Sequence, residues 1–255
     1  MERLNDILGY KNRRIYQDDN SFSFSLDSVV LANYASIRKN TRNIVDLCTG
    51  NAVVPLILSL RTDAHIDGVE ILDNLYDMGV RSVEYNKLDK QIELFNSDIK
   101  DYYLRHIDNY DLITCNPPYF KVNESNYTNL TVEKRIARHE VKINLDEVVE
   151  IASKMLHDKG LFAIVHRTDR LLEVLETLKK YDLEPKRIMF VYTKLSKNSE
   201  LFFVEARKNG NSGLKVEKPL ILYSEDGKMT EEYSQLLLEV RKWFRKVMII
   251  VQPCT

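Results

Sequence analysis

The sequence has few glycines and cysteines and no pattern of metal ligands. Its 255 residues include eight Gly and three Cys, namely Cys48, Cys115 and Cys254. No two cysteines have metal-ligand spacing, the five histidines are dispersed, and an odd number of cysteines suits a reducing compartment. We therefore expect a cytoplasmic protein without a metal site, in which each glycine at a predicted turn is informative.

Long apolar runs and an excess of charge are also missing. No run approaches the roughly 20 residues of a membrane span, and residues 1–6 contain no apolar signal core, so we expect no membrane partner. The net charge is −1, which argues against a protein that coats nucleic acid through bulk phosphate neutralisation. An enzyme that binds nucleic acid through local basic clusters remains possible.

Strand-like and helix-like segments alternate along the chain. Strands are predicted at residues 43–48, 66–70, 91–96, 111–115, 160–166, 188–193 and 201–207. Helices are predicted at residues 29–37, 52–60, 72–88, 145–156, 170–181 and 230–245. Only a short polar link separates the last two strands, which favours an antiparallel pair. The pattern predicts an α/β fold with a mostly parallel seven-stranded sheet, helices on both faces and an antiparallel closing hairpin.

The length suits one domain with embellishments. We expect a single domain over residues 1–255, built as an N-terminal extension and helix (1–40), a core (41–208) and a C-terminal appendage (209–255). Residues 119–143 are polar and basic without a clear period, which predicts a long loop.

Polar residues follow the ends of four predicted strands, where ligands of such sheets bind. Those expected to contact a cofactor are Asp46, Thr49, Gly50, Asn51, Glu70, Asp98 and Asn116. Taken singly, each suits a plain structural role, such as a turn residue, a surface charge or a helix N-cap. Their order, in register with the strands, favours a shared binding site.

The chemistry of these positions indicates a nucleoside pocket. A tight turn at Gly50 lets backbone N–H groups approach a ligand closely. Glu70 can accept both hydroxyls of a ribose, as carboxylates do in dinucleotide folds, and Asp98 can accept from an adenine amino group. Because the sequence has no glycine-rich phosphate-binding loop, S-adenosylmethionine fits this pocket better than NAD or ATP.

The sharpest motif comprises the predicted catalytic residues, Asn116, Pro117, Pro118 and Tyr119. An exocyclic amine is a poor nucleophile because its lone pair is delocalised into the ring. The Asn116 side-chain oxygen and the Pro117 carbonyl can hold its two hydrogens, so that the lone pair faces a methyl group. Tyr119 can stack on the base, which contributes roughly 1–3 kcal/mol. Catalysis would then rest on alignment without a strong base; the alternative is a plain strand-to-loop turn with a core tyrosine.

With these motifs, the chain resembles the Rossmann-like methyltransferases that act on amino groups, and more narrowly the bacterial tRNA1(Val) adenine-37 N6-methyltransferases. The similarity is carried by residues 8–11, 17–18, 24–32, 46–52, 116–119, 137–140 and 223–233. It implies a Rossmann-like core, S-adenosylmethionine as cofactor with S-adenosylhomocysteine as product, and methylation of adenosine 37 in tRNA. It also implies binding of the anticodon loop, where bases can be splayed out without breaking a duplex. We expect a monomer.

Two positions depart from the family pattern, in which the cofactor loop has glycine. Cys48 and Ala52 carry a Cβ there, which predicts crowding of the methionine part of the cofactor and weaker binding.

Basic residues near the motifs are the predicted RNA contacts, and a solvated surface is the alternative for each cluster. They are Lys11, Arg13, Arg14, Arg135, Arg138 and His139.

Other functions remain open at this stage. The amino group could belong to guanine N2 in rRNA or to a protein glutamine, although residues 1–23 are too few for the helical recognition domain usual in the latter enzymes. A non-catalytic RNA-binding module that kept the fold is the alternative from a different class.

Overall fold

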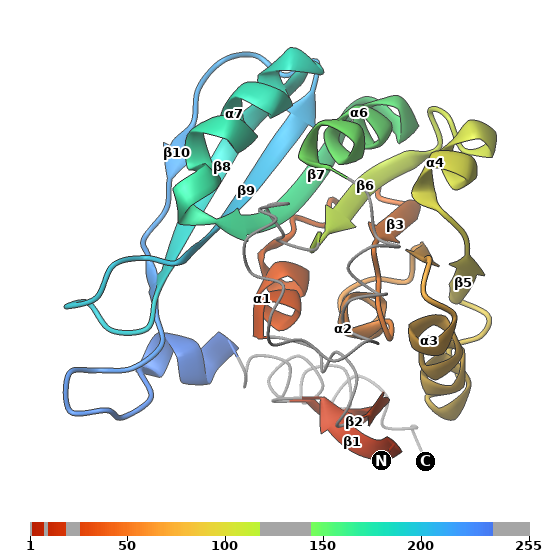
Figure 1. The fold of residues 1–255 in the computed structure, drawn as a ribbon, viewed down its shortest axis with the longest axis horizontal. Helices are drawn as coiled ribbons and strands as arrows, with labels where there is room; N and C mark the ends of the chain where they lie inside the picture. Colours follow the sequence, from red (N-terminus) through yellow and green to blue (C-terminus); the bar gives the residue numbers. More distant parts are fainter. Residues whose placement is uncertain (1, 8–9, 19–25, 118–143, 237–255) are drawn as a thin grey trace, which may run out of the picture.

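The computed structural model describes residues 2–7, 10–18, 26–117 and 144–236, and the structural statements below concern these residues. Their centre is a nine-stranded sheet in the order β10-β8-β9-β7-β6-β3-β4-β5, with β11 also paired to β8 (Figure 1). The strands are β3 (Asn43–Leu47), β4 (His65–Glu70), β5 (Ile92–Asn96), β6 (Tyr110–Cys115), β7 (Leu156–Arg167), β8 (Leu183–Tyr192), β9 (Leu201–Lys208), β10 (Lys215–Val216) and β11 (Leu220–Ile221).

The predicted α/β fold is confirmed. The seven expected strands are all present, and the ladders from β5 through β7 are parallel. Strand β9 runs antiparallel to both β7 and β8, which forms the predicted hairpin. The sheet is wider than predicted because the two-residue strands β10 and β11 add to the outer edge of β8.

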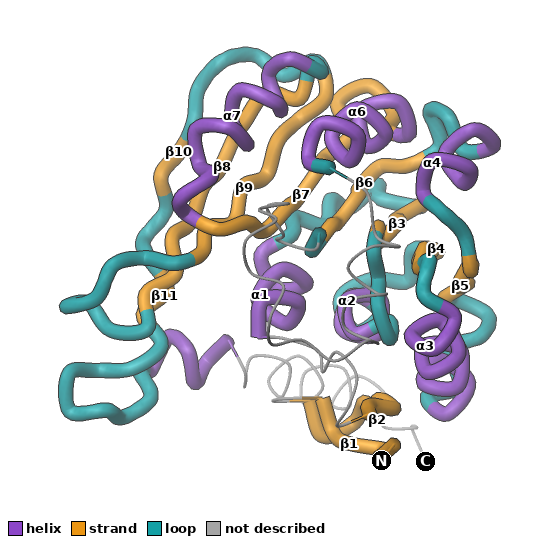
Figure 2. The backbone as a smooth tube through the Cα atoms, viewed as in Figure 1, coloured by secondary structure: helices purple, strands orange, loops and turns teal. Residues whose placement is uncertain are grey.

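Helices cover both faces of the sheet, as Figure 2 shows. One face carries α1 (Leu26–Tyr34), α2 (Val53–Leu58) and α3 (Asp73–Tyr85), and the other carries α4 (Ile99–Tyr102), α6 (Leu145–Met155) and α7 (Leu171–Lys180), with short 3-10 turns at Tyr103–Arg105 and Thr168–Arg170. Alternate strand residues supply the two cores. Ile44 packs with the α1 and α2 side, whereas Val45 and Leu47 pack with the α6 side, as the period of two in a strand requires.

Helix α6 illustrates how sequence specifies these elements. The Asn144 side chain accepts from the backbone N–H of Glu147, and the Glu147 side chain accepts from the backbone N–H of Asn144, which forms a capping box. Leu145, Val148 and Ala152 then recur at helical spacing and are buried. The helix ends at Met155 and the chain enters β7 directly.

The strand order reverses between β3 and β6. From β3 the chain builds outward through β4 to β5, and from β6 it builds the other way through β7 to β9 and β8. Such a switch point opens a crevice at the carboxyl ends of the strands. The 48–52 loop follows β3 and Asn116 follows β6, so both lie at this crevice.

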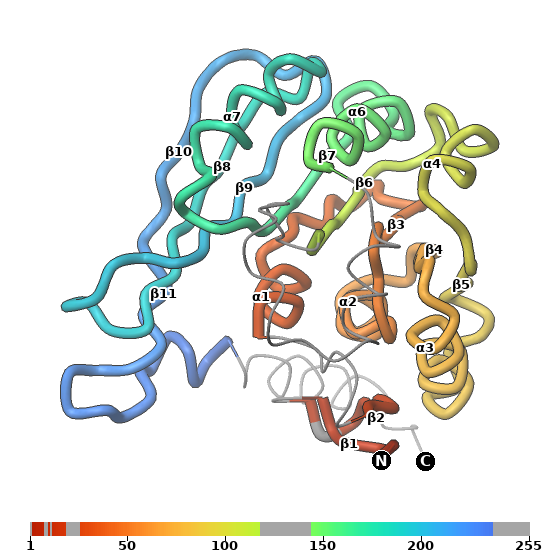
Figure 3. Tube along the Cα trace, in the orientation of Figure 1, coloured from red at the N-terminus to blue at the C-terminus, as the bar shows by residue number. Residues whose placement is uncertain are grey.

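An N-terminal hairpin, which the sequence did not predict, packs near the same edge. Strand β1 (Glu2–Ile7) pairs antiparallel with β2 (Tyr10–Asp18), and in the trace of Figure 3 the hairpin lies beside α3. The Tyr16 backbone N–H donates to Ser82 Oγ at 2.9 Å, and the Arg81 guanidinium lies 4.7 Å from the Tyr16 ring centroid. The hairpin is therefore fixed to the helix that follows β4.

Two remaining predictions fall partly or wholly outside the described residues. The predicted helix at 230–245 is confirmed for residues 231–236, and the predicted loop at 119–143 cannot be compared. Within the described ranges, no helix has the length and apolar character needed to cross a membrane.

A candidate active site at the carboxyl edge of the sheet

The loop after β3 has an unusual backbone. Cys48, Gly50 and Ala52 all have positive φ, at 58°, 59° and 70°. A non-glycine residue in this region costs about 1–2 kcal/mol, so the surrounding contacts must hold the loop in place. The Thr49 N–H donates to the Val69 carbonyl at 3.0 Å, and the Asn51 side chain donates to the Tyr16 carbonyl at 2.9 Å.

Open space lies over the centre of this loop. A Cβ added to Gly50 would have no described heavy atom within 4 Å, so a ligand can approach the backbone here. Ala52 is fully buried and its methyl group packs in the core with α1 and α2. Its side chain therefore enters the core, and crowding of the cofactor by Cys48 or Ala52 stays a prediction.

Cys48 lies against the opposite core and contacts Cys115 at the end of β6. Burial raises the pKa of the Cys115 thiol well above its usual value, and the hydrogen bond with Cys48 raises it further. The two thiols lie together because β3 and β6 are neighbours, with Leu47 paired to Cys115.

Asp46 at the end of β3 is a buried acid, only 2% exposed. Thr114 Oγ1 donates to its Oδ1 at 2.6 Å. Burial raises the pKa of Asp46 to about 7; hydrogen bonds from the Thr114 and Thr49 side chains oppose this rise and the negative charge of Glu70 adds to it. A carboxyl that titrates near neutrality at a strand end is typical of functional sites.

Glu70 ends β4 and connects it to the loop. Its Oε2 accepts from the Gly50 N–H at 2.8 Å, and its Oε1 accepts from the Leu72 N–H at 2.9 Å. The side chain is 6% exposed, so the surface-charge alternative is wrong. Burial raises the pKa of Glu70 while the backbone donors lower it. A carboxylate has about four acceptor positions. The backbone N–H groups of Gly50, Ile71 and Leu72 occupy three of them, which leaves capacity for a further donor.

Asp98 after β5 has the structural role weighed for it. Its Oδ1 accepts from the Lys100 N–H at 2.8 Å, which caps α4. A contact between Asp98 and an adenine remains a prediction.

Asn116 lies at the end of β6 with its amide held by α1. Its Nδ2 donates to Ser28 Oγ at 2.9 Å, which orients the amide plane and distinguishes its nitrogen side from its oxygen side. Ser28 is 8% exposed. Ser28 was not predicted as a site residue; the signal for it was a polar residue inside a buried apolar helix. Pro117 is buried, and Pro118 and Tyr119 lie outside the described residues.

His166, a second residue that was not predicted, lies beside this strand end. Cys115 of β6 pairs with Ile164 of β7. His166 and Pro117 each follow these paired residues by two positions, so both lie at the same edge of the sheet. Burial lowers the pKa of His166 to about 4, and the nearby Arg170 charge lowers it further. His166 is therefore neutral at pH 7, and its Nδ1 accepts from the Arg167 N–H at 2.8 Å.

The predicted RNA contacts are only partly visible. Arg13 and Arg14 lie on β2, where Arg14 Nε donates to Asp6 Oδ1 at 3.0 Å. Burial lowers the pKa of Arg13. The backbone of Lys11 belongs to β2, and its side chain is not described. Residues 135, 138 and 139 lie outside the described ranges.

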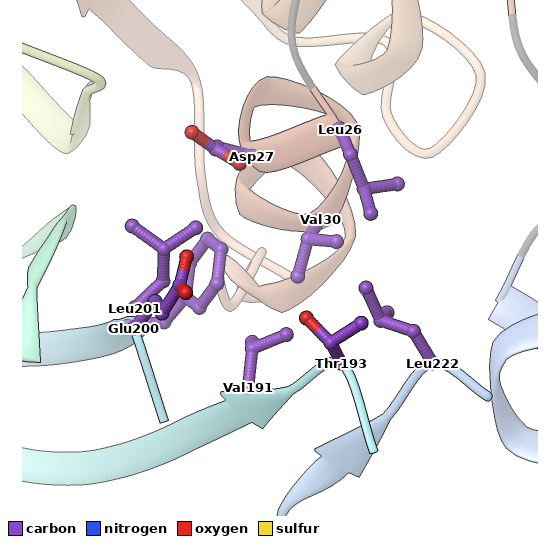
Figure 4. Close-up of a pocket in the computed structure, with 9 residues that line it drawn as sticks. Leu26, Asp27, Val30, Val191, Thr193, Glu200, Leu201 and Leu222 are labelled. Atoms are coloured by element: carbon purple, nitrogen blue, oxygen red, sulfur yellow. The ribbon is translucent and has the colours of Figure 1, made fainter. Parts of the chain in front are cut away.

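A cavity of about 100 Å³ opens at the same edge, between α1 and the β8–β9 hairpin (Figure 4). Leu26, Asp27 and Val30 of α1 line one wall, so the helix that holds Asn116 through Ser28 also forms the cavity. The other lining residues are Val191, Thr193, Glu200, Leu201, Phe203 and Leu222.

Potential metal ligands gather elsewhere. In the described part of the chain, the group that could hold an ion is His65, Asp67 and Glu93. It lies toward the amino ends of β4 and β5, away from the crevice.

Comparisons with known proteins agree with this geometry. A family model described as methyltransferase small domain matches residues 26–182. The chain is 23% identical to a protein of Flavobacterium psychrophilum named tRNA1(Val) (adenine(37)-N6)-methyltransferase, over 90% of this chain and 97% of that protein. It is 26% identical to a protein of the same name from Actinobacillus pleuropneumoniae serotype 7, over 89% and 93%. The resemblance expected from the motifs is confirmed.

Solved structures share the fold. A predicted O-methyltransferase from Agrobacterium tumefaciens matches with a TM-score of 0.64 at 16% identity, over 85% of this chain and 97% of that one. TYW2 of Pyrococcus horikoshii, in complex with MeSAdo, matches with a TM-score of 0.58 at 15% identity, over 82% and 72%. At these identities the likeness concerns the fold alone.

Proposed function

Because the chain belongs to the methyltransferase small domain family, we propose that it methylates N6 of an adenine in tRNA, at adenosine 37 of tRNA1(Val), with S-adenosylmethionine as donor. The observation that carries the proposal is the placement of Asn116. Its oriented amide lies at the switch point beside the 48–52 loop. The names of the relatives support the choice of tRNA and of the target atom.

The cofactor-binding residues of this proposal are Asp46, Thr49, Gly50, Asn51, Glu70, Asp98 and Asn116. When bound, S-adenosylmethionine supplies an electrophilic methyl group. The open space over Gly50 fits a ligand that approaches the backbone. Glu70, fixed by two backbone donors, would accept the ribose hydroxyls, and Asp98 would accept from the adenine amino group.

Asn116 and Pro117 would hold the target amine. The Asn116 side-chain oxygen and the Pro117 carbonyl would accept its two hydrogens, which localises the lone pair on the nitrogen. Ser28 supports this role because it engages the amide nitrogen and so fixes which atom of the amide faces the amine. Pro118 would stiffen the turn and Tyr119 would stack on the base. The surplus proton would leave to water after transfer, so alignment contributes most of the rate.

The RNA would bind across the N-terminal hairpin and the region after Tyr119. Lys11, Arg13 and Arg14 lie on a strand whose Tyr16 carbonyl is bonded to Asn51 of the cofactor loop, so a phosphate held there would lie close to the cofactor. Arg135, Arg138 and His139 are the further RNA contacts of this proposal. We propose that residues 1–255 form one domain that acts as a cytoplasmic monomer.

Transfer of labelled methyl groups to total tRNA, followed by nucleoside analysis, tests the proposal. Label in N6-methyladenosine at position 37, absent with an Asn116→Ala variant, is the expected result. Label in N2-methylguanosine or in protein glutamine would replace the substrate and keep the site. Cofactor binding without transfer to any acceptor would favour the non-catalytic module.

A further inference from the structure

The N-terminal hairpin contacts the cofactor loop through the side chain of Asn51. This residue lies in the 48–52 loop, and its Nδ2 donates to the Tyr16 carbonyl of β2 at 2.9 Å. Asn51 is only 4% exposed, so its amide is enclosed between the loop and the hairpin. The amide nitrogen therefore holds the loop against the hairpin, which is an indirect way of serving the cofactor.

Helix α3 holds the same hairpin residue from its backbone nitrogen. The Tyr16 N–H donates to Ser82 Oγ at 2.9 Å, and Ser82 is fully buried. The Tyr16 ring also meets the Tyr85 ring edge-on, with the ring centroids 6.5 Å apart. Tyr16 thus connects α3 to the cofactor loop through the two polar groups of its own backbone.

Asn86 at the C-cap of α3 fixes the hairpin a second time. Its Oδ1 accepts from the Arg14 N–H at 3.1 Å, and its Nδ2 donates to the Arg14 carbonyl at 2.6 Å. Ser82 and Asn86 are four residues apart and share one face of the helix. Arg14 and Tyr16 alternate along one edge of β2. The helix therefore satisfies backbone groups that an edge strand would otherwise leave unpaired.

Helix α3 also approaches the loop directly, at Gly79. A Cβ built on Gly79 would lie 3.5 Å from the Gly50 carbonyl oxygen and 3.4 Å from the Asn51 carbonyl carbon. Asn86 lies two turns further along the helix, about 10 Å from Gly79 at 1.5 Å per residue. The bonds described above thus connect Asn86 to the loop through β2.

The loop has a conformation that such contacts must stabilise. Cys48 and Ala52 are non-glycine residues with positive φ, which costs free energy. Glu70 holds the Gly50 N–H from the β4 side, and Asn51 holds the loop to the hairpin. Without the Asn51 bond, the loop would populate other conformations, and a ligand would bind only the fraction that keeps the native shape.

We infer that the N-terminal hairpin braces the cofactor loop in its ligand-binding shape, with Asn51 and Asn86 as the positioning residues. The inference rests on the proposed function, in which the ligand is S-adenosylmethionine. It gives the β1–β2 hairpin a role in binding the methyl donor, in addition to the proposed contacts with RNA. A substitution at Asn86 should therefore change cofactor affinity through β2, without touching the ligand.

Calorimetric titration of S-adenosylmethionine into the full-length protein tests the inference. Asn51→Ala should raise the Kd about tenfold, the scale of one buried hydrogen bond. Asn86→Ala should raise it about threefold, because Asn51 still holds the strand. Lys90→Ala changes an exposed residue in the turn after α3 and is the matched control, with an unchanged Kd. At saturating cofactor, kcat should stay near the wild-type value in all three variants.

Two further measurements distinguish bracing from a general loss of stability. Once Asn51→Ala has released the loop, adding Asn86→Ala should raise the Kd no further, whereas independent effects would multiply. In the protein without cofactor, Asn51→Ala and Asn86→Ala should each speed amide hydrogen exchange in residues 48–52, because the loop opens more often. Lys90→Ala should leave this exchange unchanged.

The outcomes separate the inference from the function on which it rests. An unchanged Kd and unchanged loop exchange in Asn86→Ala would overturn the inference and leave the function intact. Multiplying effects in the double variant would also overturn it, because the two residues would then act separately. If the wild type binds the cofactor but methylates no RNA, the proposed substrate fails and the affinities still decide the inference. If it binds no cofactor, the proposed function fails, and the inference fails with it as a statement about ligand binding.

Discussion

Two buried aspartates on neighbouring strands have opposite surroundings. Asp67 in the amino half of β4 is 6% exposed and accepts from three side chains, at 2.9 Å from Tyr102, at 2.8 Å from His65 Nε2 and from the Tyr110 hydroxyl. Asp46 at the carboxyl end of β3 is 2% exposed and accepts from Thr114. Burial raises the pKa of Asp46 to about 7.

The difference separates a structural acid from one suited to a ligand. A buried carboxylate is stable when charged only if donors replace the water that it lost. Three donors stabilise Asp67, and they also rigidify the amino half of the sheet. Asp46 lies beside the open space over Gly50 and two left-handed non-glycine residues, Cys48 and Ala52. The left-handed residues and the buried Asp46 therefore cost free energy at the carboxyl edge, and a bound ligand can offset this cost.

The largest effect should come from the carboxyl edge. Asn116→Ala removes an acceptor for the target amine, and methyl transfer should fall by roughly 10²–10³-fold, as when one preorganised polar group is removed from an active site. Cofactor affinity, measured by calorimetry, should fall far less than the rate, because Asn116 is only one of the seven residues proposed to hold the cofactor. Asn209→Ala, at the opposite end of the sheet, is the matched control and should keep the wild-type rate. Full activity of Asn116→Ala would mean that the site lies elsewhere.

In the amino half of the sheet, we expect a substitution to lower stability and to leave the methyl-transfer rate unchanged. Asp67→Ala removes the acceptor that the Tyr102 and Tyr110 hydroxyls share. The two hydroxyls lie 2.7 Å apart, so one can still donate to the other, and the free energy of unfolding in urea should fall by about 2 kcal/mol. The methyl-transfer rate per folded molecule should not change. Asp67→Asn keeps an acceptor oxygen and should recover part of the lost stability. A fall in kcat without a fall in stability would overturn the division between the two ends.

The same contrast explains what the sequence could predict. Strands β3 and β6 were predicted to within about two residues because buried parallel strands are continuous apolar runs that end in turn residues. The positions of Glu70 at the end of β4 and Asn116 after β6 followed from the predicted strands, since the carboxyl ends of parallel strands share one edge. The burial of Glu70 and its bonds to Gly50 and Leu72 did not follow, because they depend on loop geometry.

The features that the sequence did not predict depend on contacts between residues far apart in the chain. The hydrogen bond between Ser28 and Asn116 joins residues 88 apart in sequence, and no local pattern encodes it. The β1–β2 hairpin was missed because few of its side chains are buried, with Ile7, Tyr10 and Ile15 as its core residues. Its hydrophobic pattern is therefore weak, and its position depends on bonds to α3.

A smaller effect should distinguish Ser28 as a positioning residue. Ser28→Ala removes the acceptor that orients the Asn116 amide, and kcat should fall by about tenfold, the scale of one lost hydrogen bond in a buried network. The rate is measured per folded molecule, so that a loss of folded protein cannot account for the fall, and the KM for S-adenosylmethionine should not change. Ser28→Thr retains the hydroxyl and should recover most of the rate. Equal kcat for the alanine variant and the wild type would remove Ser28 from the site.

The smallest effect concerns the pH dependence of Asp46. Its pKa is raised to about 7 by burial, whereas an unfolded aspartate titrates near 3.9. Between these values the native state holds a proton that the unfolded chain has lost, so the free energy of unfolding should fall as pH rises through this window and level off above about pH 7. The non-titrating Asp46→Asn variant should lack this component. Urea unfolding from pH 5 to pH 8 should therefore show the wild type losing about 1 kcal/mol or more of stability relative to Asp46→Asn.

His166 affects the pH dependence in the opposite direction. Its pKa is lowered to about 4 in the folded protein, so its stabilisation is lost as pH falls from the unfolded value of about 6.5. Both proteins contain His166, so its effect cancels in the difference between them. Parallel profiles would mean that Asp46 is as well compensated as Asp67, and the two ends of the sheet would then differ in geometry alone.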